Sequence, residues 1–282
     1  MPDSKYVLYH GNCYDGFGAA FVAWKNFKDE AYYISCDYPE KDAPLEKIPD
    51  NSEVYVIDFS FSRDALIKAN ERFSKLVVLD HHATAEENLK GLDFCKFDMG
   101  KSGAGLALEY FPKKLPLDQE SLILYIQDRD LWKFSQLYTK EIHAALTSYP
   151  MSFHVWDGFK IKNLISDGRA LLRQMKNSVR KICDNAVLVQ IDGHSVPACS
   201  TSEYFSEIPA ELLERFPNAP FAAYWTDYLS SGKLIRRWGL RSRGDFNVSE
   251  VAKKFGGGGH KAASAFTMSV TLLFQSHLLG NP

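Results

Sequence analysis

The sequence predicts an α/β protein: an N-terminal doubly wound parallel sheet domain joined by a helical linker to a smaller C-terminal mixed α/β domain. From residue 6 to about 98, short β-rich runs alternate with helix-like stretches, which is typical of βαβ units. A long segment, 161–183, then spaces its apolar residues as a helix does. Beyond it, further strand-like runs precede a helix-like segment at 247–255.

The individual elements follow from these patterns. We expect parallel strands at 6–10, 31–35, 54–59, 75–80 and 93–97. We expect helices at 18–27, 63–73, 102–111 and 118–125, the last leading into Gln127-Asp128-Arg129-Asp130. Strands of the second sheet are expected at 186–191, 197–200, 221–226 and 235–241. The predicted segments are a first domain at 1–150, a linker at 151–183, a second domain at 184–270 and a tail at 271–282.

Composition narrows the class of protein. With 282 residues, 45% of them hydrophobic, the chain can fill two cores. A net charge of −2 argues against a protein that coats long double-stranded nucleic acid, so any nucleic-acid partner should be short. Five scattered cysteines without a CxxC pair favour reduced thiols and a cytoplasmic location. No apolar run approaches the roughly 20 residues of a membrane span, so we expect no membrane partner.

Potential metal ligands follow three of the predicted strands, and the carboxyl ends of parallel strands face one crevice. They are His10, Cys13 and Asp15 after the first strand, Asp58 after the third, and Asp80, His81 and His82 after the fourth. Nitrogen and oxygen donors favour Mn2+ or Mg2+ over a structural zinc. Asp58 is the natural candidate to bridge two ions about 3.5–4 Å apart, an arrangement used for displacement at phosphorus.

Each of these residues also has an ordinary interpretation when taken alone. Asp15 before Gly16 is typical of a turn, Asp58 could cap the helix near Ser62, and a lone His10 is more often a core residue. The repetition of the pattern after three strands favours the metal interpretation.

A glycine run, Gly256 to Gly259, precedes His260 and Lys261. Such a run is more often a flexible loop, but here it lies between a helix-like segment and a stretch of small residues. Consecutive glycines let backbone amides approach an anion closely. Nearby arginines, including Arg241, could supply forked donors for a phosphate, although a solvated basic face remains an alternative.

Together these motifs resemble the DHH phosphoesterase superfamily, and within it the branch of oligoribonucleases and cyclic-nucleotide phosphodiesterases, with a DHH domain and a DHH-associated domain. The resemblance extends over nearly the whole chain, through His10-Gly-Asn-Cys-Tyr-Asp15-Gly, Val56-Ile-Asp58, Asp80-His-His82, Asp128-Arg-Asp130 and Gly256-Gly-Gly-Gly-His260. It implies a metal-binding catalytic domain at 1–150 and a substrate-binding domain at 184–270.

The resemblance also implies roles for individual residues. Two Mn2+ ions, or Mg2+ in their place, would be bound by His10, Asp15, Asp58, His81 and Asp128. Asp80 would support the site, and His82 would face the phosphate as a catalytic residue. Substrate would be held by Arg241, Gly257, Gly258 and His260.

Two positions depart from this pattern or leave it open. Many family members have an aspartate at the position of Cys13, so we expect a weaker first ion or a softer metal bound through a thiolate. Asp128 and Asp130 lie two residues apart and, in a strand or turn, would point to opposite sides. We favour Asp128 as the ligand, with Asp130 as its alternative.

The function expected from this sequence is a metal-dependent phosphodiesterase that hydrolyses short oligoribonucleotides or linear and cyclic nucleotides. The alternatives are a phosphomonoesterase acting on 3′-phosphoadenosine 5′-phosphate and, because of Cys13, a catalytically weakened nucleotide-binding or regulatory protein. Neither the preferred substrate nor the oligomeric state is determined, and a homodimer is among the options.

Overall fold

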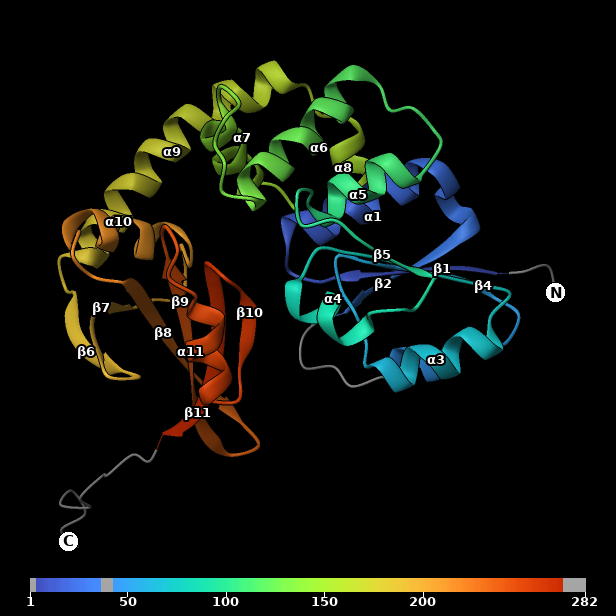
Figure 1. Ribbon diagram of the computed structural model, residues 1–282. Helices are drawn as coiled ribbons and strands as arrows, with labels where there is room; N and C mark the ends of the chain where they lie inside the picture. The colour runs from blue at the N-terminus through green and yellow to red at the C-terminus, as the bar shows by residue number, and fades with distance from the viewer. Residues whose placement is uncertain (1–3, 37–42, 271–282) are drawn as a thin grey trace, which may run out of the picture. The chain divides into compact units, whose positions relative to one another are not determined.

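The computed structural model describes residues 4–36 and 43–270 (Figure 1). The predicted tail at 271–282 lies outside these residues. The chain divides into two compact units, Met1–Gln174 and Met175–Pro282, with the division inside one long helix, α9 (Ile161–Cys183). Among the described residues, no helix is long and apolar enough to cross a membrane.

The first unit is built on a parallel five-stranded sheet in the order β2-β1-β3-β4-β5, and the predicted doubly wound sheet is therefore confirmed. Its strands are β1 (Lys5–His10), β2 (Ala31–Cys36), β3 (Glu53–Ile57), β4 (Lys75–Asp80) and β5 (Cys95–Phe97). The remaining elements are α1 (Tyr14–Phe27), η1 (Lys28–Glu30), α2 (Ala43–Glu46), α3 (Arg63–Arg72), α4 (Ala83–Leu89), α5 (Gly103–Tyr110), α6 (Leu117–Asp130), α7 (Thr139–Leu146) and α8 (Phe153–Asp157).

Both faces of this sheet are covered. In β3, Val54 and Val56 belong to one apolar cluster, whereas Tyr55 and Ile57 belong to another, as expected when successive side chains point to opposite faces. Helices α1, α5 and α6 pack on the face of Tyr55, and α3 packs on the face of Val54 (Figure 1). A strand that is buried on both faces has a nearly continuous run of apolar residues, and such runs predicted these strands from the sequence.

The second unit contains a mixed six-stranded sheet in the order β10-β11-β9-β8-β7-β6, so the predicted smaller mixed α/β unit is also confirmed. Its elements are β6 (Val187–Ile191), β7 (His194–Ser200), α10 (Glu207–Arg215), β8 (Phe221–Ser230), β9 (Lys233–Ser242), α11 (Val248–Lys254), β10 (Gly258–His260) and β11 (Ala263–Val270). Strands β7 and β8 pair in parallel, with α10 as their crossover, and the other neighbours pair antiparallel.

Two helices differ from the expected bounds in ways that matter for the site. Helix α1 begins at Tyr14, so Asp15 lies in the first turn of a helix rather than in a β-turn. Helix α6 continues to Asp130, so Asp128 and Asp130 lie in its last turn rather than in a strand or loop. The predicted helix at 118–125 was too short because the polar run from Gln127 to Asp130 interrupts the apolar pattern.

Candidate metal centre

The carboxyl ends of β1, β3 and β4 bring the predicted ligands of the first unit together. These strands are direct neighbours in the sheet. His10 is the last residue of β1, Asp58 follows β3, and Asp80 ends β4 just before His81 and His82. The backbone N–H of Asp58 donates to the carbonyl of Leu79 at 2.9 Å, which fixes Asp58 against the end of β4.

Asp58 lies at the centre of this group. Its Oδ1 atom is 3.1 Å from Nε2 of His81, and its Oδ2 atom is 3.5 Å from Nδ1 of His10 and 3.7 Å from Sγ of Cys13. The residue is only 1% exposed and has a φ of 58°, a left-handed conformation that is uncommon for a residue other than glycine. Strained backbone of this kind costs roughly 1–3 kcal/mol and concentrates at functional sites.

Asp15 approaches the same group from α1. Its Oδ2 atom lies 3.6 Å from Nε2 of His81. The carboxylate also accepts hydrogen bonds from the backbone N–H groups of Gly103 (2.6 Å) and Ala104 (3.0 Å), at the start of α5. Gly103 has to be glycine, because a Cβ there would lie 2.3 Å from the Cβ of Asp58. The positive end of α5 therefore stabilises the Asp15 carboxylate and holds it in place.

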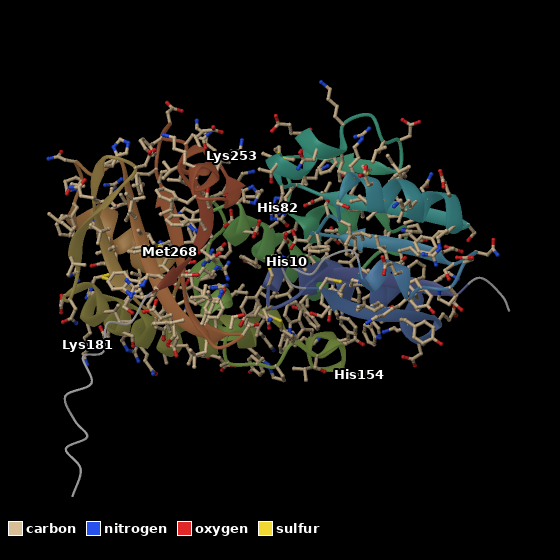
Figure 2. All side chains as sticks on the ribbon, turned by 90° about the horizontal axis from the view of Figure 1, so that it is seen from below. His10, His82, His154, Lys181, Lys253 and Met268 are labelled. Carbon is tan, nitrogen blue, oxygen red and sulfur yellow. The ribbon has the colours of Figure 1, made fainter. Side chains whose placement is uncertain are left out.

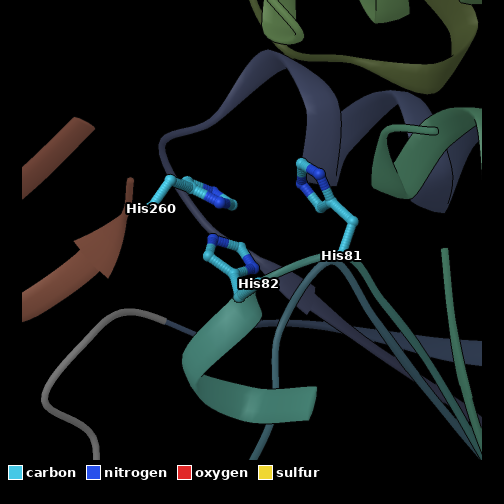
Figure 3. A group of neighbouring side chains, drawn as sticks. All are labelled: His81, His82 and His260. Atoms are coloured by element: carbon cyan, nitrogen blue, oxygen red, sulfur yellow. The ribbon is translucent and has the colours of Figure 1, made fainter. Parts of the chain in front are cut away.

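Asp80 and His82 form a tightly bonded pair. Asp80 is fully buried, and its Oδ1 accepts from the N–H of His81 (2.7 Å) and lies 2.6 Å from Nδ1 of His82, while its Oδ2 accepts from Ser60 (2.5 Å). This hydrogen bond fixes the orientation of the His82 ring through Nδ1. His81 and His82 stand side by side just before α4 (Figure 3). The rings of His10 and His82 lie 6.3 Å apart, and both residues are labelled in Figure 2.

The structure places Asp130, rather than Asp128, at this group. Oδ2 of Asp130 lies 3.7 Å from Nε2 of His81. Both oxygens of Asp128 instead accept hydrogen bonds from the loop after α6, at 2.9 and 2.6 Å from N and Oγ of Ser135, 3.1 Å from N of Gln136 and 2.5 Å from Oγ1 of Thr139. Of the two alternative ligands, Asp130 is thus the one that lies near His81, whereas both oxygens of Asp128 accept hydrogen bonds from the loop. In the last turn of a helix, residues two apart face different directions.

The buried charges of this group influence one another strongly. Burial and the carboxylates of Asp58 and Asp130 raise the pKa of Asp15 well above its usual range. Burial opposes ionisation of Asp58, but hydrogen bonds from His10 and His81 outweigh it and lower the pKa of Asp58. For His81, burial lowers the pKa, but Asp58, Asp15 and Asp130 raise it to about 10. An arrangement with this much negative charge is one that a cation would stabilise.

The donor set fits divalent ions. Within the described residues, ligand atoms of Asp15, Asp58 and His81 all lie within 4.8 Å of one another, as do those of His10, Cys13 and Asp58. Asp58 belongs to both groups, as a carboxylate shared by two ions would. These clusters could hold metal ions. Burial and the surrounding carboxylates raise the pKa of the Cys13 thiol well above its usual range, so without a cation Cys13 is a neutral thiol.

In the second unit, the sheet register places two of the predicted substrate-binding residues in one row. Ala263 pairs with His260 on one side and with Arg241 on the other. Because paired residues of antiparallel strands point to the same face, the side chains of Arg241 and His260 share a face, with a small alanine between them.

The glycine run has a structural role at its start. The N–H groups of Gly256 and Gly257 donate to the carbonyls of Lys253 (3.0 Å) and Ala252 (2.9 Å) at the end of α11. A Cβ at Gly257 would lie 2.1 Å from the carbonyl oxygen of Ala265. The Gly257 amide is therefore engaged in a hydrogen bond to Ala252, and close packing against Ala265 leaves no space for a side chain at Gly257. Gly258, where a Cβ would meet nothing within 4 Å, remains in the proposed substrate-binding set.

Several contributors to the site escaped sequence analysis. The hydroxyl of Ser60 donates a hydrogen bond to Asp80, and the hydroxyls of Ser135 and Thr139 donate hydrogen bonds to Asp128. Gly103 has no side chain that would clash with Asp58. Ser60 lies two residues after Asp58, but a serine after a strand carries no distinctive signal. Gly103 lies far from Asp58 in the sequence, and Ser135 and Thr139 follow Asp128 by 7 and 11 residues, in a segment that no local pattern marks.

The chain is similar to several known proteins in sequence or in fold. No protein family model matches the chain. The chain is 33% identical over 288 residues to the uncharacterized protein R106 of Acanthamoeba polyphaga mimivirus, covering 93% of this chain and 67% of that protein. It is 26% identical over 301 residues to oligoribonuclease NrnB of Bacillus subtilis, covering 94% of this chain and 73% of that protein. Among solved structures, the pGpG-specific phosphodiesterase PggH of Vibrio cholerae shares the fold, with a TM-score of 0.51 at 14% identity over 95% of this chain and 94% of that one.

Of these similar proteins, NrnB is named as an oligoribonuclease. The chain belongs to the same protein family as the mimivirus protein R106.

Proposed function

We propose that this chain is a divalent-metal-dependent phosphodiesterase that hydrolyses short oligoribonucleotides or nucleotides, with Mn2+ as the preferred ion. The observation that carries this proposal is the position of Asp58 between the imidazoles of His10 and His81. The name of the relative NrnB supports the oligonucleotide class of substrate. The catalytic domain would be the predicted segment 1–150, and the substrate-binding domain the segment 184–270.

The proposed ligands are His10, Asp15, Asp58, His81 and Asp130, with Cys13 beside the first ion. Two divalent ions, when bound, supply positive charge for the phosphoryl oxygens and activate a water molecule. Asp15 is held in position by the N–H groups of α5, so this ligand needs little reorganisation when an ion binds. Because Cys13 supplies a thiol instead of a carboxylate, we expect the ion beside His10 to be bound more weakly than the other ion.

His82 would act on the substrate directly. Its Nδ1 is hydrogen-bonded to the Asp80 carboxylate, which also accepts a hydrogen bond from the hydroxyl of Ser60. Burial lowers the pKa of His82, but its hydrogen bond to Asp80 and the negative charge of Asp80 outweigh burial and raise this pKa above its usual value. A protonated His82 would stabilise charge on the phosphate or donate its Nε2 proton to the leaving oxygen. In the second unit, Arg241, Gly258 and His260 would bind the terminal phosphate or base of the substrate.

The test is a substrate panel incubated with purified chain and Mn2+, with EDTA as control. The panel contains labelled RNA as a dinucleotide, a pentamer and a long single strand, together with cyclic AMP and 3′-phosphoadenosine 5′-phosphate. We expect Mn2+-dependent cleavage of the short RNA members, abolished by the double substitution of His81→Ala and His82→Ala. Release of phosphate from 3′-phosphoadenosine 5′-phosphate alone would indicate a phosphomonoesterase. Nucleotide binding without any turnover, with bound metal verified, would indicate a regulatory protein.

A further inference from the structure

We propose that the loop at 131–138 is a nucleobase-stacking platform beside the metal centre, with Trp132 as the stacking side chain. This inference rests on the proposed function and states where a base of the substrate would lie. The loop directly follows Asp130, whose Oδ2 is 3.7 Å from Nε2 of His81. Two residues of chain span at most about 7 Å, so Trp132 lies close enough to contact a base attached to a phosphate at this centre.

The loop is held firmly, so Trp132 is presented in a defined position. The N–H of Trp132 donates to the carbonyl of Arg129 at 3.0 Å, and that of Lys133 donates to the carbonyl of Asp128 at 2.9 Å. The Asp128 carboxylate then accepts from Ser135 and Gln136 further along the loop. Asp128 therefore ties the loop to the helix that also carries Asp130. Binding groups are more effective when their position is fixed before the substrate arrives.

The backbone of the loop is strained at its aromatic residues. Trp132, Phe134 and Tyr138 have φ values of 55°, 47° and 75°. Bulky side chains rarely adopt this left-handed region, and each instance costs on the order of 1–3 kcal/mol. Glycine would make the same turns without that cost. The aromatic side chains are thus present despite their backbone strain, which points to a use for the side chains themselves.

The side chains of the loop combine exposed aromatic surface with positive charge. Trp132 is 42% exposed and packs edge to face with Phe134, with 4.8 Å between ring centroids. The guanidinium of Arg129 lies 4.3 Å from the Trp132 ring centroid, and Nζ of Lys140 lies 4.8 Å from that of Phe134. Aromatic faces that stack on bases, next to cations that attract phosphates, are typical of sites for single-stranded nucleic acid.

The test compares a substrate that carries bases with one that carries none. Trp132→Ala and wild type are assayed with Mn2+ on the 5′-phosphorylated diadenylate and on methyl p-nitrophenyl phosphate. We expect Trp132→Ala to lower the ratio of kcat/KM for the diadenylate to that for the ester by about tenfold, through KM, because a stacked base contributes on this scale. Trp132→Phe should recover most of the ratio, since phenylalanine also stacks. The control is Leu137→Ala on the same loop, 71% exposed, which should leave the ratio unchanged.

A direct binding measurement separates this proposal from the proposed function. A phosphorothioate diadenylate is titrated into wild type and Trp132→Phe while tryptophan fluorescence is recorded. We expect quenching in wild type that is largely lost in Trp132→Phe, whether or not the chain turns over any phosphodiester. Equal quenching in both proteins, or an equal loss of kcat/KM for both substrates in Trp132→Ala, would overturn the stacking role. Absence of turnover on every phosphodiester would instead overturn the proposed function.

Discussion

Nε2 of His81 lies 3.1 Å from Oδ1 of Asp58, although the two residues follow different strands of the parallel sheet. This contact is a consequence of topology, because β3 and β4 are neighbours and their carboxyl ends meet at one edge. The same carboxylate reaches His10 through its other oxygen. Asp58 is therefore the residue on which a two-metal site at this edge of the sheet would depend most.

Asp128 and Asp130 should respond differently to removal of their charge. Asp130→Asn should bind less Mn2+ and lose about a hundredfold or more in turnover, because loss of a ligand weakens charge stabilisation at the centre by several kcal/mol. Asp128→Asn should lower the free energy of unfolding by roughly 2 kcal/mol, since its amide would face the donor of Gln136. Metal analysis, initial rates and thermal melts check both variants. Metal loss in Asp128→Asn with full retention in Asp130→Asn would show that the assignment is reversed.

Cys13→Asp should strengthen the binding of the Mn2+ ion nearest to His10. An ionised carboxylate replaces a thiol whose burial, together with the carboxylates of Asp58, Asp130 and Asp15, raises its pKa well above the usual range. We expect a Kd for Mn2+ that is lower by about tenfold, with Cys13→Ser as the matched control, because serine keeps the size without the charge. Isothermal titration measures both. An unchanged affinity and rate in Cys13→Asp would show that Cys13 does not occupy a ligand position.

His82→Ala should reduce kcat while leaving metal binding intact. The reason is that Nδ1 of His82 is hydrogen-bonded to Asp80, so this nitrogen is already engaged by a carboxylate. Loss of a general acid or of a charge donor typically lowers rates by about 10²–10⁴-fold. Asp80→Asn should show a smaller loss and a lowered upper limit in the pH profile of kcat, since Asp80 acts by raising the pKa of His82. A matching loss of Mn2+ in His82→Ala would mean that His82 is a ligand instead.

Asp157 should give the first unit a pH-dependent stability. Burial would raise the pKa of Asp157, but Lys25 and Lys28 outweigh it and lower this pKa. Asp157 also accepts a hydrogen bond from Gln119 at 2.9 Å, so it links α8 to α1 and α6. A carboxylate with a lowered folded-state pKa adds stability above its unfolded pKa of about 3.9 and loses it as the pH falls through the folded value.

The difference in Tm between wild type and Asp157→Asn should therefore be constant from about pH 7 to 5 and shrink below about pH 4. The control is Asp64→Asn, which changes an exposed carboxylate in the first turn of α3. A Tm difference that stays constant through pH 3 would contradict the role of charge at Asp157.

The sequence predicted the sheet domain well because its strands are buried on both faces and read as apolar runs. It also predicted His10, Asp15, Asp58 and His81 as neighbours. His10 ends a strand, and the other three follow the carboxyl ends of strands. It favoured Asp128 over Asp130 as the ligand, whereas the structure brings Asp130 close to His81. That choice depends on how far α6 extends and on a loop, pinned by Ser135 and Thr139, that no local pattern reveals. The hydrogen bond from the Gly257 amide to Ala252 could not be predicted either, because it depends on where α11 ends.

The binding stoichiometry of Mn2+ in wild type and Asp58→Asn, determined by equilibrium dialysis with Asp64→Asn as the exposed control, tests the central claim most directly. If Asp58 is shared by two ions, wild type and Asp64→Asn should bind two per chain, and Asp58→Asn should lose both at concentrations that saturate wild type. Melting curves establish that Asp58→Asn remains folded. Two ions bound with wild-type affinity in folded Asp58→Asn would contradict the account.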